Sequence, residues 1–351
     1  MKKITFIFSI IFILVLNSKA QDHTYSSFLK APVYMNPALV GVSNDNSYAR
    51  LSFINKEQYP LINNAYGFRS LAFDANFTPL MGGIGIMLDN SSEGDGFYQK
   101  NQASIVYAFK GNSFDRRKNR KFEISAAMQV SIASRSVNYS NLIFYDQLNI
   151  ETGFDPSLIS EAQNNPNEVK VFPDFSFGLC INKTIKGNSM IPNGRLTLGA
   201  SVHHLNQPDE SLISTKSILD RRYTIHGTFV SSIKRGAFRN ATFFPSFCYT
   251  RQSDLSILNI GFQTKFKQIV FGGWFKQGRM YNASQVAVFS LSYDLNAVNF
   301  ARKIPVISIG CSTDFMIKGL GAQNTGNAFE FFILYQFSML GNKPCEISEG
   351  W

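Results

Sequence analysis

The chain has 351 residues and a formal net charge of +10, yet only 17% of its side chains are charged. Soluble domains usually carry about 25% charged residues, so this composition disfavours an ordinary soluble protein. Aromatic residues make up 14%, including 33 phenylalanines, an enrichment typical of a membrane β-barrel when the mature sequence offers no spanning helix.

Residues 1–20 are predicted to form a secretory signal peptide. Two lysines give the positive start, an apolar run continues to Leu16, and Ala20 ends a small-residue cleavage site. The apolar run is shorter than the roughly 20 residues that a spanning helix needs. Because Gln21 rather than a cysteine follows the cleavage site, no lipid anchor is expected. Export also argues against a nucleic-acid partner for the basic charge.

The next segment, residues 21–46, is too apolar for a solvated tail and is interrupted by Pro32 and Pro37. Proline removes a backbone donor and fixes φ, so the segment suits neither a long helix nor a central strand. Asn36 before Pro37 favours a turn, and Gly41 permits a positive φ. We interpret the segment as a plug in the lumen of a closed sheet; the alternative is a segment packed on an ordinary core. The plug residues are Tyr34, Met35, Asn36, Pro37 and Gly41.

Residues 47–337 alternate between apolar and polar side chains in about fourteen runs, the period of half-buried strands. The runs are 47–55, 66–77, 82–90, 101–110, 121–137, 174–183, 194–204, 221–233, 241–250, 255–266, 268–277, 283–294, 305–316 and 327–337. A soluble β-sandwich would show the same alternation. The aromatic enrichment, the signal peptide and the aromatic last strand favour an all-β fold, a transmembrane antiparallel β-barrel. Residues 338–351 then form a short periplasmic tail.

The connections predict the orientation of the barrel. Residues 138–173 form by far the longest connection, residues 205–220 form another long one, and several connections on the other side are short. Outer-membrane barrels have short periplasmic turns and longer outer loops. Because an even number of strands returns the chain to its starting side, we expect both chain ends in the periplasm.

The longest connection carries candidate partner-binding residues. Aromatic anchors with charged neighbours are typical of protein interfaces. The alternative is that these side chains fold the loop onto the mouth of the barrel. The candidates are Tyr139, Phe144, Tyr145, Asp146 and Phe154.

No catalytic or metal-binding pattern occurs in the sequence. His203 and His204 are adjacent in a predicted strand, so they should point to opposite faces and should not share a metal ion. The four cysteines have no CxxC spacing, and GxSxG, Walker and HExxH motifs are missing. The glycines of residues 82–85 have no helix after them, so we interpret them as relieving crowding where a strand meets the plug. We expect no enzyme activity, no metal, no cofactor and no obligatory disulfide.

Several segments, in order along nearly the whole mature chain, resemble the PorP/SprF family of outer-membrane proteins of type IX secretion. They include the plug segment, GGIGIMLDN at 82–90, NLIFYDQLN at 141–149, FPDFSFGL at 172–179 and LGASVHHLNQP at 198–208. The resemblance implies a non-enzymatic barrel of the long-chain-fatty-acid-transporter type in the Gram-negative outer membrane. It also implies that the protein binds, exports or anchors specific secreted or surface proteins, such as gliding adhesins, through their C-terminal domain.

The same resemblance defines the expected partners. They are the C-terminal domain of a secreted or surface protein, other type IX components such as a periplasmic ring or lipoprotein, and outer-membrane lipid. The alternative function is transport of a small hydrophobic molecule across the outer membrane. A transporter should show ligand-dependent uptake, and its deletion should leave surface proteins unaffected.

Overall fold

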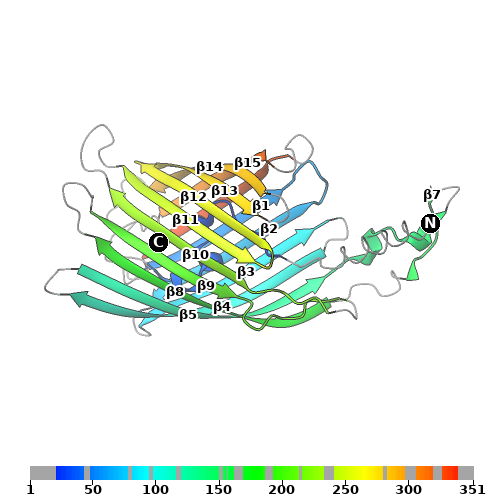
Figure 1. Ribbon diagram of the computed structural model, residues 1–351, viewed down its shortest axis with the longest axis horizontal. Coiled ribbons are helices and arrows are strands. Elements are labelled where there is room, and N and C mark those ends of the chain that lie inside the picture. Colours follow the sequence, from blue (N-terminus) through cyan, green and yellow to red (C-terminus); the bar gives the residue numbers. More distant parts are fainter. Residues whose placement is uncertain are drawn as a thin grey trace, which may run out of the picture.

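The computed structural model describes residues 21–42, 48–77, 81–94, 98–115, 120–149, 153–155, 157–161, 169–185, 193–212, 216–232, 241–279, 283–296, 306–318 and 326–338. The predicted signal peptide and nearly all of the predicted tail lie outside these residues. Fourteen strands form a closed antiparallel barrel (Figure 1). No helix in the described ranges is long and apolar enough to cross a membrane.

The barrel strands follow one another around the wall in chain order, and the first pairs with the last. They are β1 (Tyr48–Gln58), β2 (Tyr66–Phe77), β3 (Gly82–Glu93), β4 (Tyr98–Asp115), β5 (Arg120–Ser136), β8 (Val169–Ile185), β9 (Gly194–His203), β10 (Arg222–Ser232), β11 (Thr242–Gln252), β12 (Leu255–Phe266), β13 (Ile269–Arg279), β14 (Ala283–Asn296), β15 (Val306–Lys318) and β16 (Ala328–Ser338). The predicted barrel and each predicted strand are confirmed, with shifts at the strand ends.

Alternation along each strand separates two environments. In β9, Leu198 is exposed on the outer face whereas Thr197 and Ser201 are buried inside. In β16, Phe329 faces out and Glu330 faces in. Because strand side chains alternate between the two faces, the outer surface is apolar and the inner surface polar, as in a membrane barrel.

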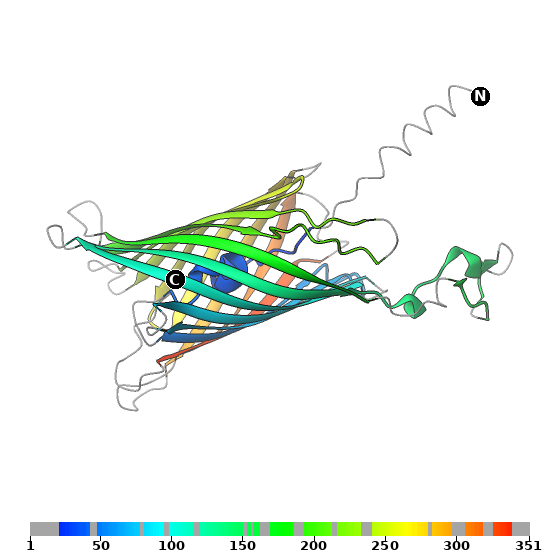
Figure 2. The ribbon, with the colours of Figure 1, turned by 90° about the horizontal axis from the view of Figure 1, so that it is seen from below.

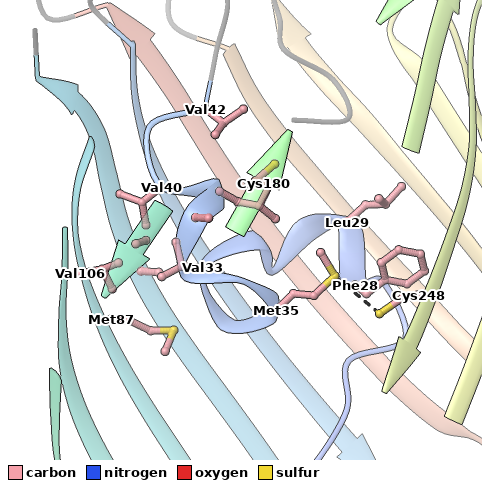
Figure 3. Close-up of a cluster of buried hydrophobic side chains, with 14 of the residues drawn as sticks. Phe28, Leu29, Val33, Met35, Val40, Val42, Met87, Val106, Cys180 and Cys248 are labelled. Carbon is pink, nitrogen blue, oxygen red and sulfur yellow. Dashed lines mark hydrogen bonds between the residues drawn. The ribbon is translucent and has the colours of Figure 1, made fainter. Parts of the chain in front are cut away.

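The N-terminal segment lies inside the ring of strands (Figure 2). It contains η1 (Phe28–Lys30), α2 (Pro32–Met35) and η2 (Pro37–Leu39). Pro32 and Pro37 each begin a short helix, a position where the missing N–H has no intrahelical partner to lose. The apolar side chains of the segment pack against the inner wall (Figure 3), and the labelled contacts are Phe28, Leu29, Val33, Met35, Val40 and Val42 with Met87, Val106, Cys180 and Cys248.

The segment runs along the barrel from one end to the other. Asp22 lies beside Lys100 at the end that carries the β5–β8 connection, which we call the long-loop end. Gly41 contacts Asp74 at the opposite end, where β1 begins and Ser338 of β16 lies. The expectation that both ends lie on one side is therefore wrong for the start of the described chain, because the segment traverses the lumen before β1 begins.

The β5–β8 connection extends beyond the barrel (Figures 1 and 2). It contains η4 (Tyr139–Asn141), η5 (Tyr145–Gln147) and a hairpin of β6 (Leu148–Asn149) and β7 (Gly153–Phe154). The connection ends earlier than the predicted residue 173, because β8 already begins at Val169. Pro173 lies where β8 has only β5 as a neighbour, since β9 joins it from Phe177 onward, and such an edge position tolerates a residue without N–H.

Candidate functional site

Asn36 holds the middle of the N-terminal segment against the wall. Its Nδ2 donates to the carbonyl oxygens of Leu179 and Ala200 at 3.0 and 3.3 Å. The same nitrogen lies 2.9 Å from Nε2 of His226. Its Oδ1 accepts the N–H of Ala38 at 2.9 Å and so caps η2. One side chain therefore joins the segment to β8, β9 and β10.

Glycines in the wall make room for the segment. A Cβ added to Gly178 would lie 2.1 Å from Oδ1 of Asn36. A Cβ added to Gly83 would lie 2.3 Å from the carbonyl oxygen of Val40. Real Cβ atoms essentially never approach closer than 3.0 Å, so both positions require glycine while the segment is in place. The interpretation that the glycines of residues 82–85 relieve crowding is supported at Gly83.

At the long-loop end, Asp22 lies among three basic groups. Its carboxylate oxygens are 3.2 Å from Nζ of Lys100, 2.5 Å from Nε2 of His204 and 3.2 Å from Nη1 of Arg222. Nδ1 of His204 lies 2.9 Å from Oδ2 of Asp174. An imidazole that contacts a carboxylate at each nitrogen is suited to the protonated form, which donates from both. We call these five residues the Asp22 clamp.

Burial and charge act in opposite directions on the Asp22 clamp. Burial disfavours the imidazolium of His204, but the charge of Asp22 and hydrogen bonds to Asp174 and Asp22 outweigh it, so the pKa of His204 is raised. Burial also disfavours the carboxylate of Asp22. The charges of Lys100, His204 and Arg222 together nevertheless hold the pKa of Asp22 well below its usual value. The clamp therefore favours the charged forms of both groups.

The prediction that His203 and His204 point to opposite faces is wrong. Strand β9 ends at His203, and His204 has a left-handed φ of +57° that breaks the alternation and leaves both side chains buried. Nδ1 of His203 lies 3.1 Å from Oγ of Ser176, and the two imidazole rings are 6.4 Å apart. In the part of the chain that the structure describes, no group of three or more His, Cys, Asp or Glu side chains is placed to hold a metal ion.

Raising the pH should weaken the Asp22 clamp. The stabilisation from charged His204 is fully present below its unfolded pKa of 6.5 and is lost as the pH rises through its raised folded pKa. We expect the thermal midpoint of the detergent-solubilised barrel to fall between pH 6 and pH 9. A His204→Asn variant should lack this part of the pH dependence. An identical fall in the variant would show that other groups titrate instead.

At the opposite end, Asp74 and Arg50 hold Gly41. One carboxylate oxygen of Asp74 accepts the N–H of Gly41 and the other accepts from Nε of Arg50, both at 2.8 Å. Nζ of Lys110 donates to the carbonyl oxygen of Gly41. Gly41 has a φ of +63°, and a Cβ there would lie 2.7 Å from the carbonyl oxygen of Ala75. Both the backbone conformation and the close approach require glycine.

Strands near the seam between β1 and β16 hold the first part of the segment. Glu330 accepts the backbone N–H of Ser26 and of Ser27, each at 2.9 Å. Nζ of Lys56 donates to Oγ of Ser26 at 2.8 Å and lies 3.7 Å from Asp314. The segment is therefore bound by charged side chains of β1, β15 and β16 as well as by Asn36 and the clamp.

Tyr34 and Met35 are the two candidate plug residues of α2. The hydroxyl of Tyr34 donates to the carbonyl oxygen of His23 at 2.7 Å, and the guanidinium of Arg222 lies 4.3 Å from its ring centroid. Met35 is buried, with its Sδ 3.7 Å from Sγ of Cys248 (Figure 3). Pro37 is buried in η2, directly after α2. The structure thus places all of the candidate plug residues along one continuous path in the lumen.

The five candidate residues of the long connection have different surroundings. The rings of Tyr139 and Phe144 have centroids 6.3 Å apart. Tyr145 is 90% exposed, and Phe154 is also exposed. Asp146 instead accepts hydrogen bonds from two later residues of the connection, at 2.8 and 3.1 Å, and so contributes to the fold of the loop. Tyr145, Asp146 and Phe154 are therefore the accessible candidates, whereas Tyr139 and Phe144 are half-buried.

The other long connection folds back onto the barrel. Glu210 is fully buried and forms an ion pair with Arg135 of β5 at 2.9 Å. Leu219 is also buried, and Asp209 accepts the N–H of Ser217 across the loop at 2.9 Å. In its described residues, this connection is folded onto the barrel. Of these two long connections, the β5–β8 connection extends outward.

The sequence matches one protein family over nearly its whole length. The family described as "Type IX secretion system membrane protein PorP/SprF" matches residues 17–335. The chain belongs to the PorP/SprF family. It is therefore a membrane component of type IX secretion, and this membership together with the closed barrel supports a location in the outer membrane.

Two solved barrel structures are similar to this chain only at low sequence identity and low TM-score. "CymD monoaromatic hydrocarbon channel" is 10% identical, with 88% of this chain and 93% of that chain covered and a TM-score of 0.43. A Pseudomonas aeruginosa FadL homologue is 10% identical, with 83% and 89% covered and a TM-score of 0.37. Likenesses this weak carry no argument about function. No curated protein matches the sequence.

This PorP/SprF protein contains contact residues that sequence reasoning missed. Arg50, Lys56 and Glu330 occupy inward positions of predicted strands, and a buried charge must find a partner. Asp22 is the only acidic residue between Gln21 and Val42. The inward-facing basic residues and this single acid were the sequence features that could have indicated the Asp22 clamp. The alternation of apolar and polar residues did not show which strands contact which part of the segment.

Proposed function

We propose that this PorP/SprF protein holds the C-terminal domain of a secreted, surface-displayed protein, such as a gliding adhesin, on its β5–β8 connection and performs no chemistry. The observation that carries the proposal is the exposed apolar surface of this connection. Tyr145 is 90% exposed, Ile159 75% and Ile143 60%. An exposed apolar group of this kind on a loop beyond the barrel is typical of a protein-binding surface.

We further propose that residues 21–46 plug the lumen, so that the barrel acts as a holder and not as an open pore. The support is the set of contacts that the segment makes at both ends and at Asn36. Two cavities beside the segment have volumes of about 30 Å³ each, which is room for water molecules only. A small hydrophobic substrate, the alternative cargo, would pass only after displacement of the segment.

Removing the exposed part of the loop tests the holder function. Replacing residues 141–154 by a short Gly-Ser linker should leave a barrel that resists heat in detergent, because these residues lie outside the barrel strands. The cargo should then be released into the medium, measured by immunoblotting of cells and supernatant. Cargo that stays on the cell surface would show that it binds another part of the protein.

A double substitution tests the same surface more finely. Tyr145→Ala with Ile159→Ser should reduce surface cargo by about tenfold or more, as expected when interface anchors are truncated. Leu61→Ser is the matched control, because Leu61 is an exposed aliphatic residue of the β1–β2 connection at the same end. Equal loss with the control would contradict a specific contact. Ligand-dependent uptake with unchanged surface proteins would favour the transporter.

A further inference from the structure

A groove on the outer wall crosses six neighbouring strands, β1 to β5 and β8. Its volume is about 470 Å³. The lining combines apolar side chains, such as Leu88 and Ile132, with the polar side chains of Arg69 and Asn101. These residues alternate with buried lumen residues along their strands, so they lie on the face opposite the N-terminal segment.

The pairing register arranges the groove in two rows. The polar row runs directly across five strands through Asn55, Arg69, Asn90, Asn101 and Ser134. Residues two positions along each strand lie on the same face, and they form an apolar row of Phe53, Leu71, Leu88, Ala103 and Ile132. A polar row that directly borders an apolar row marks the edge of the membrane-facing belt on this side of the barrel.

Arg69 supplies positive charge at this edge. Its side chain is exposed, and its Nε donates to Oδ1 of Asn55 at 3.3 Å. Nδ2 of Asn90 donates to Oδ1 of Asn101 at 2.7 Å in the same row. Asp89 also lines the groove, but it is half-buried and alternates with Leu88 and Asn90 along β3, so its carboxylate is not part of this row. A guanidinium flanked by amides is suited to phosphate oxygens, to which Arg donates two parallel hydrogen bonds.

Ala103 makes the groove deep below the polar row. Its cross-strand neighbours are Leu88 and Ile132, both exposed and both larger. A methyl group between two long side chains leaves a hollow with apolar walls. The hollow opens onto the outer face at the level of the apolar row, so it is accessible to an acyl chain of the bilayer.

We propose that this groove binds a membrane lipid with a phosphorylated headgroup. The phosphate lies on Arg69 and the neighbouring amides, and one acyl chain lies over Ala103. A lipid fits better than a protein segment, because the groove continues the apolar belt that the bilayer covers and its charge complements a phosphate. The site is independent of the β5–β8 connection and of the lumen segment, so it does not rest on the proposed function.

Native mass spectrometry of the full protein in dodecyl maltoside tests the site. The probe is dioleoylphosphatidylglycerol, compared with dioleoylglycerol, which has the same chains and no phosphate, and with inorganic phosphate alone. We expect one retained phosphatidylglycerol and no retention of the other two. Arg69→Ala should weaken retention by about tenfold, the loss expected for a charge-assisted contact. Ala103→Leu, which fills the hollow, should also weaken it.

Two matched substitutions serve as controls. Arg251→Ala removes an exposed arginine of β11, and Ala200→Leu enlarges an exposed alanine of β9, both away from the groove. Both controls should retain the lipid as the unchanged protein does. Equal losses in controls and groove variants, equal retention of dioleoylglycerol, or retention of phosphate alone would each overturn the proposal. A variant that does not migrate as a folded barrel in unheated gels is replaced by Arg69→Gln or Ala103→Val.

Discussion

An Asp74→Ala substitution should lower the free energy of unfolding by about 3–5 kcal/mol, the range for removing one partner of a buried ion pair. Arg50 is 1% exposed, and its guanidinium would lose the carboxylate that neutralises it at 2.8 Å. The N–H of Gly41 would lose its acceptor at the same time. Urea unfolding of the barrel in lipid vesicles would measure the loss from the shift of the midpoint.

Two variants separate charge from hydrogen bonding at this position. Asp74→Asn keeps an acceptor for Gly41 but removes the negative charge, so it should lose most of the same stability. Asp254→Ala removes an exposed acid from the turn between β11 and β12 and should leave the unfolding curve unchanged. If Asp74→Ala shifts the midpoint no further than Asp254→Ala does, the ion pair with Arg50 is not stabilising.

A methyl group on Gly83 or Gly178 should make the barrel conduct ions, if the N-terminal segment closes the lumen. The added Cβ at Gly83 would meet the backbone oxygen of Val40 at 2.3 Å, and the one at Gly178 would meet the capping oxygen of Asn36 at 2.1 Å. Overpacking of this kind costs about 1–3 kcal/mol. The cost falls on the contact between segment and wall, because the neighbouring strands keep their backbone pairing.

Conductance in planar lipid bilayers would measure the opening. The unchanged protein should be nearly silent, and Gly83→Ala and Gly178→Ala should show frequent ion-conducting events. Gly273→Ala is the matched control, because the nearest heavy atom to its added Cβ is 4.0 Å away. Proteolysis would show whether the segment is released from the lumen. If it is released in both variants and neither conducts ions, something other than the segment closes the barrel.

The barrel could be predicted because its wall separates two environments. Leu198 and Thr197 are neighbours with opposite surroundings, so a period of two records the strand directly. The turn at His204 could not be predicted in the same way, because one left-handed residue ends the alternation without any change in composition. The pair of Asp22 and Lys100 spans 78 positions and depends on the direction of the segment, which no local pattern contains.

The exposed surface of the β5–β8 connection was only partly predicted. The candidates Tyr145 and Asp146 are both exposed, and Asp146 also accepts a hydrogen bond within the loop. Ile143 and Ile159 were not chosen, although they are among the more exposed apolar residues there. Aliphatic side chains in a loop do not by themselves indicate a binding surface. The sequence does not show whether the loop folds onto the barrel, which would bury them, or extends from it, which would expose them.

The path of the N-terminal segment constrains the order in which the molecule can be assembled. Asp22 and Gly41 lie at opposite ends of the lumen, so a barrel that closed first could be filled only by drawing the chain through its whole length. Strand β16, the last strand that the structure describes, contributes Glu330, which binds Ser26 and Ser27. We therefore expect the wall to form around the segment, with the pairing of β16 and β1 enclosing it last.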